Sequence, residues 1–371
     1  MKYKLGEICE IISGSTPKTG IPEYWDGTQK WITPAELNED TYIITDSIRK
    51  LTELGVEKAG LSSFPEGTVI LSSRAPIGKV AIAGCEMYCN QGFKNLICSE
   101  KINNHYLYWF LKGRTEYLNS LGRGATFKEI SKQIVSNIEI DVPPIEQQKR
   151  AVNQLEKANA IIQLRKQQLQ KLDELVKARF VEMFGDLVVG NKIKTNRHKI
   201  GDIAFVTKLA GFEFTKYVQY KECGDIIMLR GLNCKKGKLV LDDIKWIDKA
   251  TSDLLPRSKL YYGDILMTYA GTIGDVAMVD ADDKYHLAPN VAKITLKEEA
   301  YNPIFLMHLF LYTNNYIMTF ASKVAQASIN MGKIRNLEYF FPDIDMQNWF
   351  ATFVEQVDKS KVVVQDEVNG L

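Results

Sequence analysis

The longest helical pattern along the chain covers residues 146–184. This stretch contains neither glycine nor proline, and it is rich in Gln, Lys, Leu, Glu and Ala, most of which favour helices. Apolar residues recur in it at every seventh position, at Leu155, Ile162, Leu169, Val176 and Met183. Such a repeat is typical of helices that pair in coiled coils, so we predict one long helix that Gly185 terminates. At 1.5 Å per residue, this helix would be about 58 Å long.

A second helical pattern begins at about Met346 and continues to the end of the sequence. Its apolar residues recur at steps of four and three positions and are Phe350, Val354, Val357, Val364 and Val368. Lys361 is the polar member of the same row. Two such stripes in one chain can cover each other, so we expect the two helices to pair antiparallel in a coiled coil. The alternative is that each stripe packs only on its own globular domain.

The sequence before each long helix has a mixed pattern. Short runs rich in β-branched and aliphatic residues, such as 67–71 and 263–267, lie between Gly, Pro and Asn turns and predict short strands. Residues 106–118 and 305–317 each predict a helix. These two stretches are therefore expected to be α+β domains.

An internal repeat relates the two halves of the chain. The segment Lys-Leu-Gly-Glu-Ile at 4–8 returns as Lys-Ile-Gly-Asp-Ile at 199–203. Further matches follow in the same order at offsets of 196 and 199, namely Gly67 with Gly263, Ile77-Gly78 with Ile273-Gly274, and Pro143, Ile145 and Gln148 with Pro342, Ile344 and Gln347. Collinear matches over such a distance indicate a duplicated unit.

The predicted fold class is therefore α+β, with two similar globular domains that two long antiparallel coiled-coil helices separate and join. We place the first domain at residues 1–145 and the first helix at 146–188. The second domain covers 189–343, and the second, shorter helix covers 344–371.

Composition limits the class of protein. The 371 residues are 45% apolar and 25% charged, which is close to the average for globular proteins, and the formal net charge is only +2. We expect no membrane span, because the longest apolar stretch, 304–312, is far shorter than about 20 residues. The N-terminus lacks the apolar region of a signal peptide, and six cysteines are too few for a disulfide scaffold. We therefore expect a cytoplasmic protein.

Sequence patterns of catalytic and metal sites are absent. The chain has no G-x-x-x-x-G-K-[ST] phosphate loop, and its nearest approach to the D/N-P-P-aromatic turn of an adenine methyltransferase is Asp-Val-Pro-Pro-Ile at 141–145. Cys85 and Cys89 are not followed by a second ligand pair at zinc-site spacing, so we expect no metal site. The four histidines show no partner pattern of a nucleophile or carboxylate. We therefore predict a non-catalytic chain.

A polar, basic turn follows the predicted helix 106–118 in the first domain. It contains Arg123, Thr126, Lys128 and Lys132 and a Gly-Arg-Gly-Ala-Thr sequence. The second repeat has Lys323, Gln326, Ser328, Asn330 and Lys333 at the equivalent place. These side-chain types reach DNA phosphates and base edges, and we expect the lysines to contact phosphates and Gln326 and Asn330 to contact bases. The alternative, an ordinary solvated surface, is weakened because the turn recurs in both repeats.

The arrangement resembles the DNA specificity subunit of type I restriction-modification enzymes. The similarity rests on the helix entrance Pro-Pro-Ile-Glu-Gln-Gln at 143–148 and on the helix end at 177–186, Lys-Ala-Arg-Phe-Val-Glu-Met-Phe-Gly-Asp. It also rests on Ser-Arg-Ala-Pro-Ile-Gly at 73–78, with Tyr-Ala-Gly-Thr-Ile-Gly at 269–274 in the other half. The second helix entrance, Pro-Asp-Ile-Asp-Met-Gln at 342–347, departs from this motif.

The resemblance implies a non-catalytic reader of double-stranded DNA. Each globular domain would be a target recognition domain for one half of an asymmetric bipartite site, and the helices would set the spacing of the half-sites. Methyltransferase subunits, expected to be two, and restriction or translocase subunits would be the partners. S-adenosylmethionine, ATP and Mg would bind only to those partners. The candidate DNA-binding set is completed by Arg74, Lys79, Arg230 and Thr272.

Two other classes of protein stay open at this point. The duplicated domains could bind proteins, with the coiled coil as a scaffold that does not bind DNA. The chain could also be a methyltransferase or nuclease whose site carries no recognisable pattern. Salt-dependent binding to duplex DNA would separate the DNA reader from the scaffold, because phosphate contacts release counterions.

Overall fold

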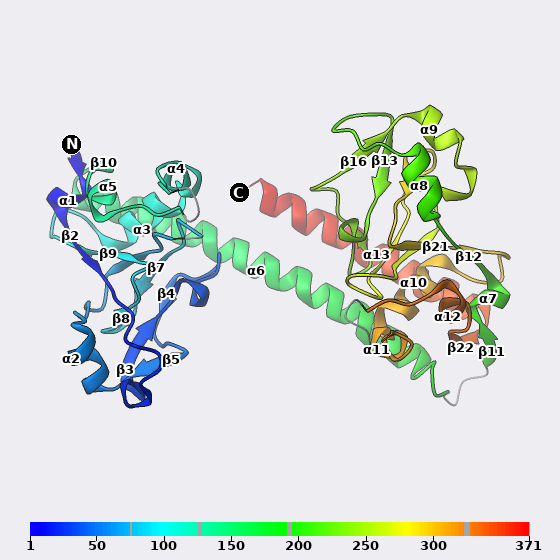
Figure 1. Ribbon diagram of the computed structural model, residues 1–371, viewed down its shortest axis with the longest axis horizontal. Helices are drawn as coiled ribbons and strands as arrows, with labels where there is room; N and C mark the ends of the chain where they lie inside the picture. Colours follow the sequence, from blue (N-terminus) through cyan, green and yellow to red (C-terminus); the bar gives the residue numbers. More distant parts are fainter. Residues whose placement is uncertain (75, 125–127, 191–194, 323–326, 371) are drawn as a thin grey trace. The chain divides into compact units, whose positions relative to one another are not determined.

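The computed structural model describes residues 1–74, 76–124, 128–190, 195–322 and 327–370 (Figure 1). The chain divides into two compact units, which we call unit 1 (Met1–Gln163) and unit 2 (Leu164–Leu371). The long helix α6, Ile145–Phe184, begins in unit 1 and ends in unit 2. No described helix is both long enough and apolar enough to cross a membrane.

Unit 1 is built on short strands. Their bounds are Lys2–Lys4 (β1), Cys9–Ser13 (β2), Trp25–Ile32 (β3), Ile43–Ile44 (β4), Arg49–Leu51 (β5), Val69–Leu71 (β6), Val80–Ala83 (β7), Tyr88–Cys89 (β8), Lys94–Cys98 (β9) and Glu139–Asp141 (β10). Among described residues they form a sheet of order β2-β9-β6-β7-β4, a sheet of order β5-β3-β8, and the antiparallel pair β1-β10. All residues of β6 and β7 are buried, which explains their continuous apolar sequences.

Short helices accompany these strands. They are α1 (Leu5–Ile8), α2 (Glu53–Ala59), α3 (Asn104–Lys112), α4 (Thr115–Ser120), α5 (Lys132–Ser136) and the 3-10 turns η1 (Pro22–Tyr24) and η2 (Pro34–Glu36). The prediction of a single helix at 106–118 was wrong, because the chain turns between α3 and α4. Gly113 and Arg114 interrupt the helix there, with Arg114 at φ −127°, and glycine is a weak helix former.

Unit 2 is also built on short strands. Their bounds are Thr195–Lys199 (β11), Ala204–Lys208 (β12), Ile226–Leu229 (β13), Cys234–Lys235 (β14), Lys238–Leu239 (β15), Lys245–Ile247 (β16), Lys259–Leu260 (β17), Ile265–Thr268 (β18), Val276–Met278 (β19), Tyr285–Leu287 (β20), Val291–Leu296 (β21) and Glu338–Pro342 (β22). The sheets have the orders β12-β21-β18-β19 and β16-β13-β20-β17, with the pairs β14-β15 and β11-β22.

The helices of unit 2 follow the same plan. They are α7 (Ile200–Ile203), α8 (Gly211–Tyr217), α9 (Lys249–Asp253), α10 (Pro303–Tyr312), α11 (Asn314–Thr319), α12 (Met331–Arg335) and α13 (Ile344–Asn369), with the 3-10 turns η3 (Gly231–Asn233) and η4 (Pro256–Ser258). The predicted helix 305–317 is again two helices, α10 and α11. Both long helices are confirmed, and Gly185 follows α6 in the left-handed conformation, with φ +62°.

The internal repeat is visible in the backbone. The pair β1-β10 corresponds to β11-β22, and β2-β9 corresponds to β12-β21. The strands β3 in unit 1 and β13 in unit 2 each pair parallel with one neighbour and antiparallel with the other. The glycines that match in sequence share positive φ values: +83° at Gly67, +84° at Gly263, +93° at Gly78 and +80° at Gly274. The α+β repeat is therefore confirmed.

Within unit 2, the second part of α6 packs antiparallel on α13. Arg165 pairs with Glu367 at 2.7 Å, and Asp173 pairs with Lys361 at 2.6 Å. Residue numbers therefore rise along α6 as those of the contacting residues fall along α13. Nearer the globular part of unit 2, the Phe180 ring lies 5.3 Å from the Phe350 ring. These contacts confirm the antiparallel pairing for this part of α6.

The predicted apolar stripes are only partly buried. Val176, Phe350, Val354, Val357 and Val364 are buried, whereas Ile162, Leu169, Met183 and Val368 are half-buried. Leu155 was predicted in the same row, but its side chain is 42% exposed and lines a groove of unit 1. The seven-residue row did not identify Phe180 and Phe184, which are 2% and 0% exposed.

Candidate nucleic-acid interface

In unit 1 the structure brings together the two segments that the sequence singled out. The Ile130 amide donates to the Ser73 carbonyl at 3.0 Å, which joins the turn after β6 to the segment before α5. Arg123 and Glu129 exchange backbone hydrogen bonds of 3.0 and 2.9 Å, and they close a small loop. The described residues 73, 74, 76–78, 121–124 and 128–132 therefore form one surface, which we call the unit 1 turn cluster.

Unit 2 has the same backbone arrangement. The Ile329 amide donates to the Tyr269 carbonyl at 2.8 Å, and the Ser322 amide donates to the Ser328 carbonyl at 2.9 Å. These bonds match those of Ile130 and Arg123 at the repeat offset. Residues 269–274 with 320–322 and 327–335 form the unit 2 turn cluster.

The side chains of the two clusters differ although their backbones correspond. In unit 1, Glu129 accepts from Arg74 Nε at 2.9 Å, and the Lys94 ammonium group lies 3.4 Å from its other carboxylate oxygen. In unit 2, Ala270 and Ser328 occupy the positions of Arg74 and Glu129. At these two positions, therefore, the unit 1 turn cluster presents a charged network and the unit 2 turn cluster presents small, neutral side chains.

Four of the predicted basic residues are exposed at the unit 1 turn cluster, namely Arg74, Arg123, Lys128 and Lys132. Arg123 also lines an open groove of about 580 Å³ together with Ser131, Gln133 and Asn137. The amide groups of Gln133 and Asn137 can donate and accept hydrogen bonds, as contacts to base edges require. The sequence prediction missed both residues. Asn137 could have been found, because Asn336 matches it at offset 199.

In unit 2, several predicted contact residues have a structural partner. Asn330 caps α12, since its Oδ1 accepts from the Lys333 amide at 2.9 Å. The Lys333 ammonium donates to the Phe320 carbonyl at 2.7 Å, and the Ser328 amide donates to the Ser322 hydroxyl at 3.1 Å. These bonds shape the turn, so a substitution at Asn330 or Lys333 would change the local structure as well as any contact with DNA, whereas the bond of Ser328 uses its backbone amide.

Lys79 and Arg230 also hold loops of their own units. The Lys79 ammonium donates to the carbonyls of Pro34 and Leu37. Arg230 is 20% exposed, and one of its guanidinium nitrogens donates to Asp243 at 2.8 Å. Thr272 is exposed at the unit 2 turn cluster. Thr126, Lys323 and Gln326 lie outside the described residues.

The described residues contain no cluster of three or more His, Cys, Asp and Glu side chains that could hold a metal ion. The buried histidines are held by backbone groups. His308 Nδ1 is 2.8 Å from the Ile304 carbonyl, and burial lowers the His308 pKa to about 4. His286 lies within 3.3 Å of the Leu255 and Leu287 carbonyls, and burial lowers its pKa as well. Both are therefore neutral core residues at neutral pH.

Comparisons with solved structures support the fold. A crystal structure of a type I restriction-modification S subunit from M. genitalium aligns over all of this chain and 92% of its own, with a TM-score of 0.54 and 11% identity. A structure from a study of complex assembly and conformational transition in the type I R-M system aligns over all of this chain and 93% of its own, with a TM-score of 0.59 and 14% identity. At these identities the likeness concerns the fold alone.

Relatives with similar sequences are also named specificity subunits of type I restriction enzymes. The MjaIX specificity subunit of Methanocaldococcus jannaschii is 39% identical over 186 residues, which cover 49% of this chain and 43% of the relative. The EcoBI specificity subunit of Escherichia coli is 20% identical over 344 residues, which cover 83% of this chain and 71% of the relative. The alignment with the first relative thus spans less than half of that protein.

The family described as type I restriction modification DNA specificity domain matches the chain twice, at residues 1–174 and 194–367. The two matches correspond to the two repeats, and together they cover most of the sequence. The prediction of a non-catalytic specificity subunit is thereby confirmed. The chain belongs to the type I restriction-modification DNA specificity family.

Proposed function

We propose that this chain reads an asymmetric, bipartite sequence in double-stranded DNA, with one half-site for each unit. The observation that carries the proposal is the pair of turn clusters, whose backbone hydrogen bonds correspond while their side chains differ. Equivalent backbones place both clusters in the same way on their own domain, and different side chains contact different bases. Two unlike readers in one chain imply two unlike half-sites.

The proposed partners follow from this role. The chain would bring DNA to methyltransferase subunits, expected to be two, and to restriction or translocase subunits. S-adenosylmethionine, ATP and Mg would bind to those subunits. We place the assembly in the cytoplasm, where it would meet DNA.

Phosphate contacts supply much of the affinity in such a complex. Lys128 is exposed in the unit 1 turn cluster, so replacing it with Ala should weaken binding to all duplex sequences alike. The slope of log affinity against log salt should fall by about one for each lost phosphate contact. The recognised sequence should stay the same.

The proposal is tested by fluorescence anisotropy with labelled duplexes over a range of salt concentrations, using the chain assembled with its methyltransferase partner. Lys58→Ala is the matched control, because Lys58 is an exposed lysine on α2 that is not one of the cluster's residues and that pairs only with its neighbour Glu57 among described residues. Methylation mapping of exposed genomic DNA then gives the recognised motif. Equal salt slopes for the wild type and Lys128→Ala would remove Lys128 from the interface, and a symmetric motif would contradict two unlike readers.

A further inference from the structure

Two cysteines of unit 1 lie directly opposite each other in a sheet. Cys9 is the first residue of β2 and Cys98 is the last residue of β9, and the antiparallel register of these strands pairs them. The Ser99 amide donates to the Ile8 carbonyl at 2.9 Å, so the adjacent cysteine pair is one without mutual hydrogen bonds. In such a pair the Cα atoms are about 4.5 Å apart, a separation that a disulfide bond can span.

Both cysteine side chains are on the same face of the sheet, because residues opposite each other in an antiparallel ladder share a face. Cys9 is 8% exposed and belongs to a core of unit 1, and Cys98 packs against that core. Hydrogen bonding with Cys98, followed by burial, raises the pKa of the Cys9 thiol. The two thiol groups are therefore neighbours at the margin of the core.

The internal repeat shows that the fold does not require this cysteine pair. In unit 2, β12 and β21 form the corresponding ladder, and the Lys297 amide donates to the Ile203 carbonyl at 3.0 Å. Ala204 and Leu296 are opposite each other there, at the places of the two cysteines. An apolar pair therefore suffices for packing at this place, and the thiol groups of unit 1 add chemistry that packing does not need.

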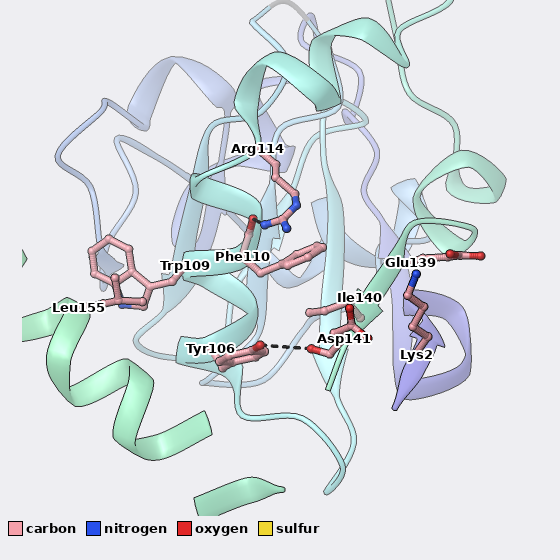
Figure 2. A pocket seen from close by; sticks show the side chains of 9 residues that line it. All are labelled: Lys2, Tyr106, Trp109, Phe110, Arg114, Glu139, Ile140, Asp141 and Leu155. Atoms are coloured by element: carbon pink, nitrogen blue, oxygen red, sulfur yellow. Dashed lines mark hydrogen bonds between the residues drawn. The ribbon is translucent and has the colours of Figure 1, made fainter. Parts of the chain in front are cut away.

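One member of the pair can be reached from solvent. The helix α3 borders two grooves of unit 1, of which the first is drawn in Figure 2 and is lined by its Tyr106 and Trp109 side chains. Asn104, at the start of α3, lines the second groove, which is open, has a volume of about 390 Å³ and includes Cys98 in its lining. A small thiol reagent would therefore meet Cys98 before it meets the buried Cys9.

We propose that Cys9 and Cys98 form a reversible disulfide bond when a low-molecular-weight disulfide such as oxidised glutathione oxidises them. The Cys98 thiolate attacks one sulfur of that disulfide, whose S–S bond breaks, and one glutathione thiolate leaves. The Cys9 thiol then loses its proton and attacks the Cys98 sulfur of the mixed disulfide, which releases the second glutathione thiolate. Two protein thiols are thereby oxidised, and their protons end on the two molecules of reduced glutathione. This chemistry is independent of DNA reading.

The disulfide bond would tie β2 to the segment that holds the first long helix. Shortly after Cys98, the Lys101 carbonyl accepts from the Gln148 side chain at 3.0 Å, and the Asn103 amide donates to the same side chain at 2.8 Å. The bond would also close a loop of about 90 residues, and such a loop stabilises the folded state because it restricts the unfolded chain. Oxidation should therefore stabilise unit 1, and reducing thiols should reverse the effect.

The test begins with the reduced full chain and oxidised glutathione at about pH 8.5, near the ordinary pKa of a cysteine thiol. Mass spectrometry of unreduced peptides then maps the disulfide bonds. We expect one linked pair of peptides, in which Cys9 is joined to Cys98. Cys223 is the internal comparison, because it is exposed and lies outside the described strands. It should end as a mixed disulfide with glutathione, and dithiothreitol should reverse both products.

Cys9→Ala is the decisive variant, because Ala204 shows that this ladder accepts alanine at the same place. Cys98 should keep its glutathione in this variant, since no second thiol displaces it. Cys85→Ala is the matched control, because Cys85 is a half-buried cysteine of unit 1 outside the pair, and it should leave the expected disulfide intact. In urea unfolding, oxidation should raise the midpoint of unit 1 by about 1 M in the wild type and not in Cys9→Ala.

Three outcomes would overturn the proposal. The first is glutathione that stays on Cys98 in the wild type as it does in Cys9→Ala, which would mean that the two thiols do not join. The second is a disulfide bond between Cys98 and any cysteine other than Cys9. The third is unmodified Cys98 under conditions that modify Cys223, which would mean that the reagent does not reach the pair. An unchanged urea midpoint after the bond has formed would contradict its stabilising effect.

Discussion

Two glutamine side chains show how single residues hold the entrance of each long helix. Gln148 is fully buried, and its amide donates to the carbonyls of Lys101 and Pro143 at 3.0 and 2.8 Å while accepting from the Asn103 amide at 2.8 Å. Gln347 accepts from Asn302 and donates to Pro342 in the same way. The glutamine match in the repeat therefore marks a hydrogen-bonded joint between the globular domain and its helix.

Replacing Gln148 with Leu should remove this joint and leave a buried amide and two carbonyls without partners. We expect a loss of about 3 kcal/mol in the free energy of unfolding, since buried unsatisfied groups cost roughly 1–3 kcal/mol each and can relax in part. Urea unfolding measures this loss in the free energy of unfolding. Gln147→Leu is the control, because the adjacent Gln147 is exposed. Equal midpoints for the two variants would show that the joint contributes nothing.

His308 should make the stability of unit 2 depend on pH. Burial lowers its pKa from 6.5 to about 4, with smaller effects from Asp358 and Asp173, which raise it, and from Lys361, which lowers it. The unfolded chain therefore binds the proton at higher pH than the folded chain does. This contribution to stability is fully present above pH 6.5 and is lost as the pH falls toward 4, by up to about 3 kcal/mol.

The measurement is urea unfolding of the wild type and of His308→Gln between pH 4 and 7. The variant should show a flatter dependence over this range, because its side chain does not titrate. Some dependence should remain, since the buried His286 also has a lowered pKa. The same slope in wild type and variant would mean that His308 does not bind its proton on unfolding.

Among the elements, the pairing of α6 with α13 depends on a polar position in an apolar stripe. Lys361 is only 13% exposed at its side chain, and its ammonium group pairs with Asp173 at 2.6 Å and Asp358 at 2.9 Å. Burial opposes its charge, but the two carboxylates outweigh this effect and raise its pKa. Both carboxylates are about half exposed, so the net contribution of the ion pairs is small.

We therefore expect Lys361→Met to leave the free energy of unfolding unchanged or to raise it by about 1–2 kcal/mol, because apolar residues often replace a buried ion pair without loss. Phe180→Ala should instead cost about 3–5 kcal/mol, since Phe180 is 2% exposed and contacts several rings. Chemical unfolding of both variants measures these changes in the free energy of unfolding. A large loss for Lys361→Met would show that the ion pairs are needed to hold the two helices together.

The elements that the sequence predicted well are those with long periodicity. Both long helices were found because a pattern over many turns has few alternatives. The break between α3 and α4 was missed because a single Gly113 interrupts an otherwise helical pattern. Phe180 and Phe184 were missed for a different reason. They pack on the globular part of unit 2, so they lie off the row that a coiled coil alone would require.

The sequence predicted where the turn clusters lie, but not the hydrogen bonds and ion pairs within them. Recurrence at the same place in both repeats located them without any knowledge of the fold. Asn330 caps α12 by accepting from the Lys333 amide because this helix begins at Met331, and the sequence did not predict that start. The sequence does not indicate a role for Lys94, because its approach to Glu129 joins positions 35 residues apart and has no local sequence signal.

At the scale of the whole molecule, the family match to both halves predicts independent specificity modules. Replacing residues 1–145 with the corresponding segment of another family member should change one half of the methylated motif and leave the other half intact. The junction lies directly before α6, so Gln148 is kept. Its partners at 101, 103 and 143 are backbone groups, which any side chains there except a proline at 103 can supply. The measurement is methylation mapping of genomic DNA with the methyltransferase partner present.

The reciprocal exchange of residues 189–343 completes this last prediction. It should change the half of the motif that the first exchange leaves intact, because each unit has its own cores and its own turn cluster. If either exchange altered both halves, the two units would not read independently. If neither altered the motif, sequence reading would lie outside the exchanged residues. Two unlike readers on one duplicated fold predict that each exchange changes one half of the motif and leaves the other half intact.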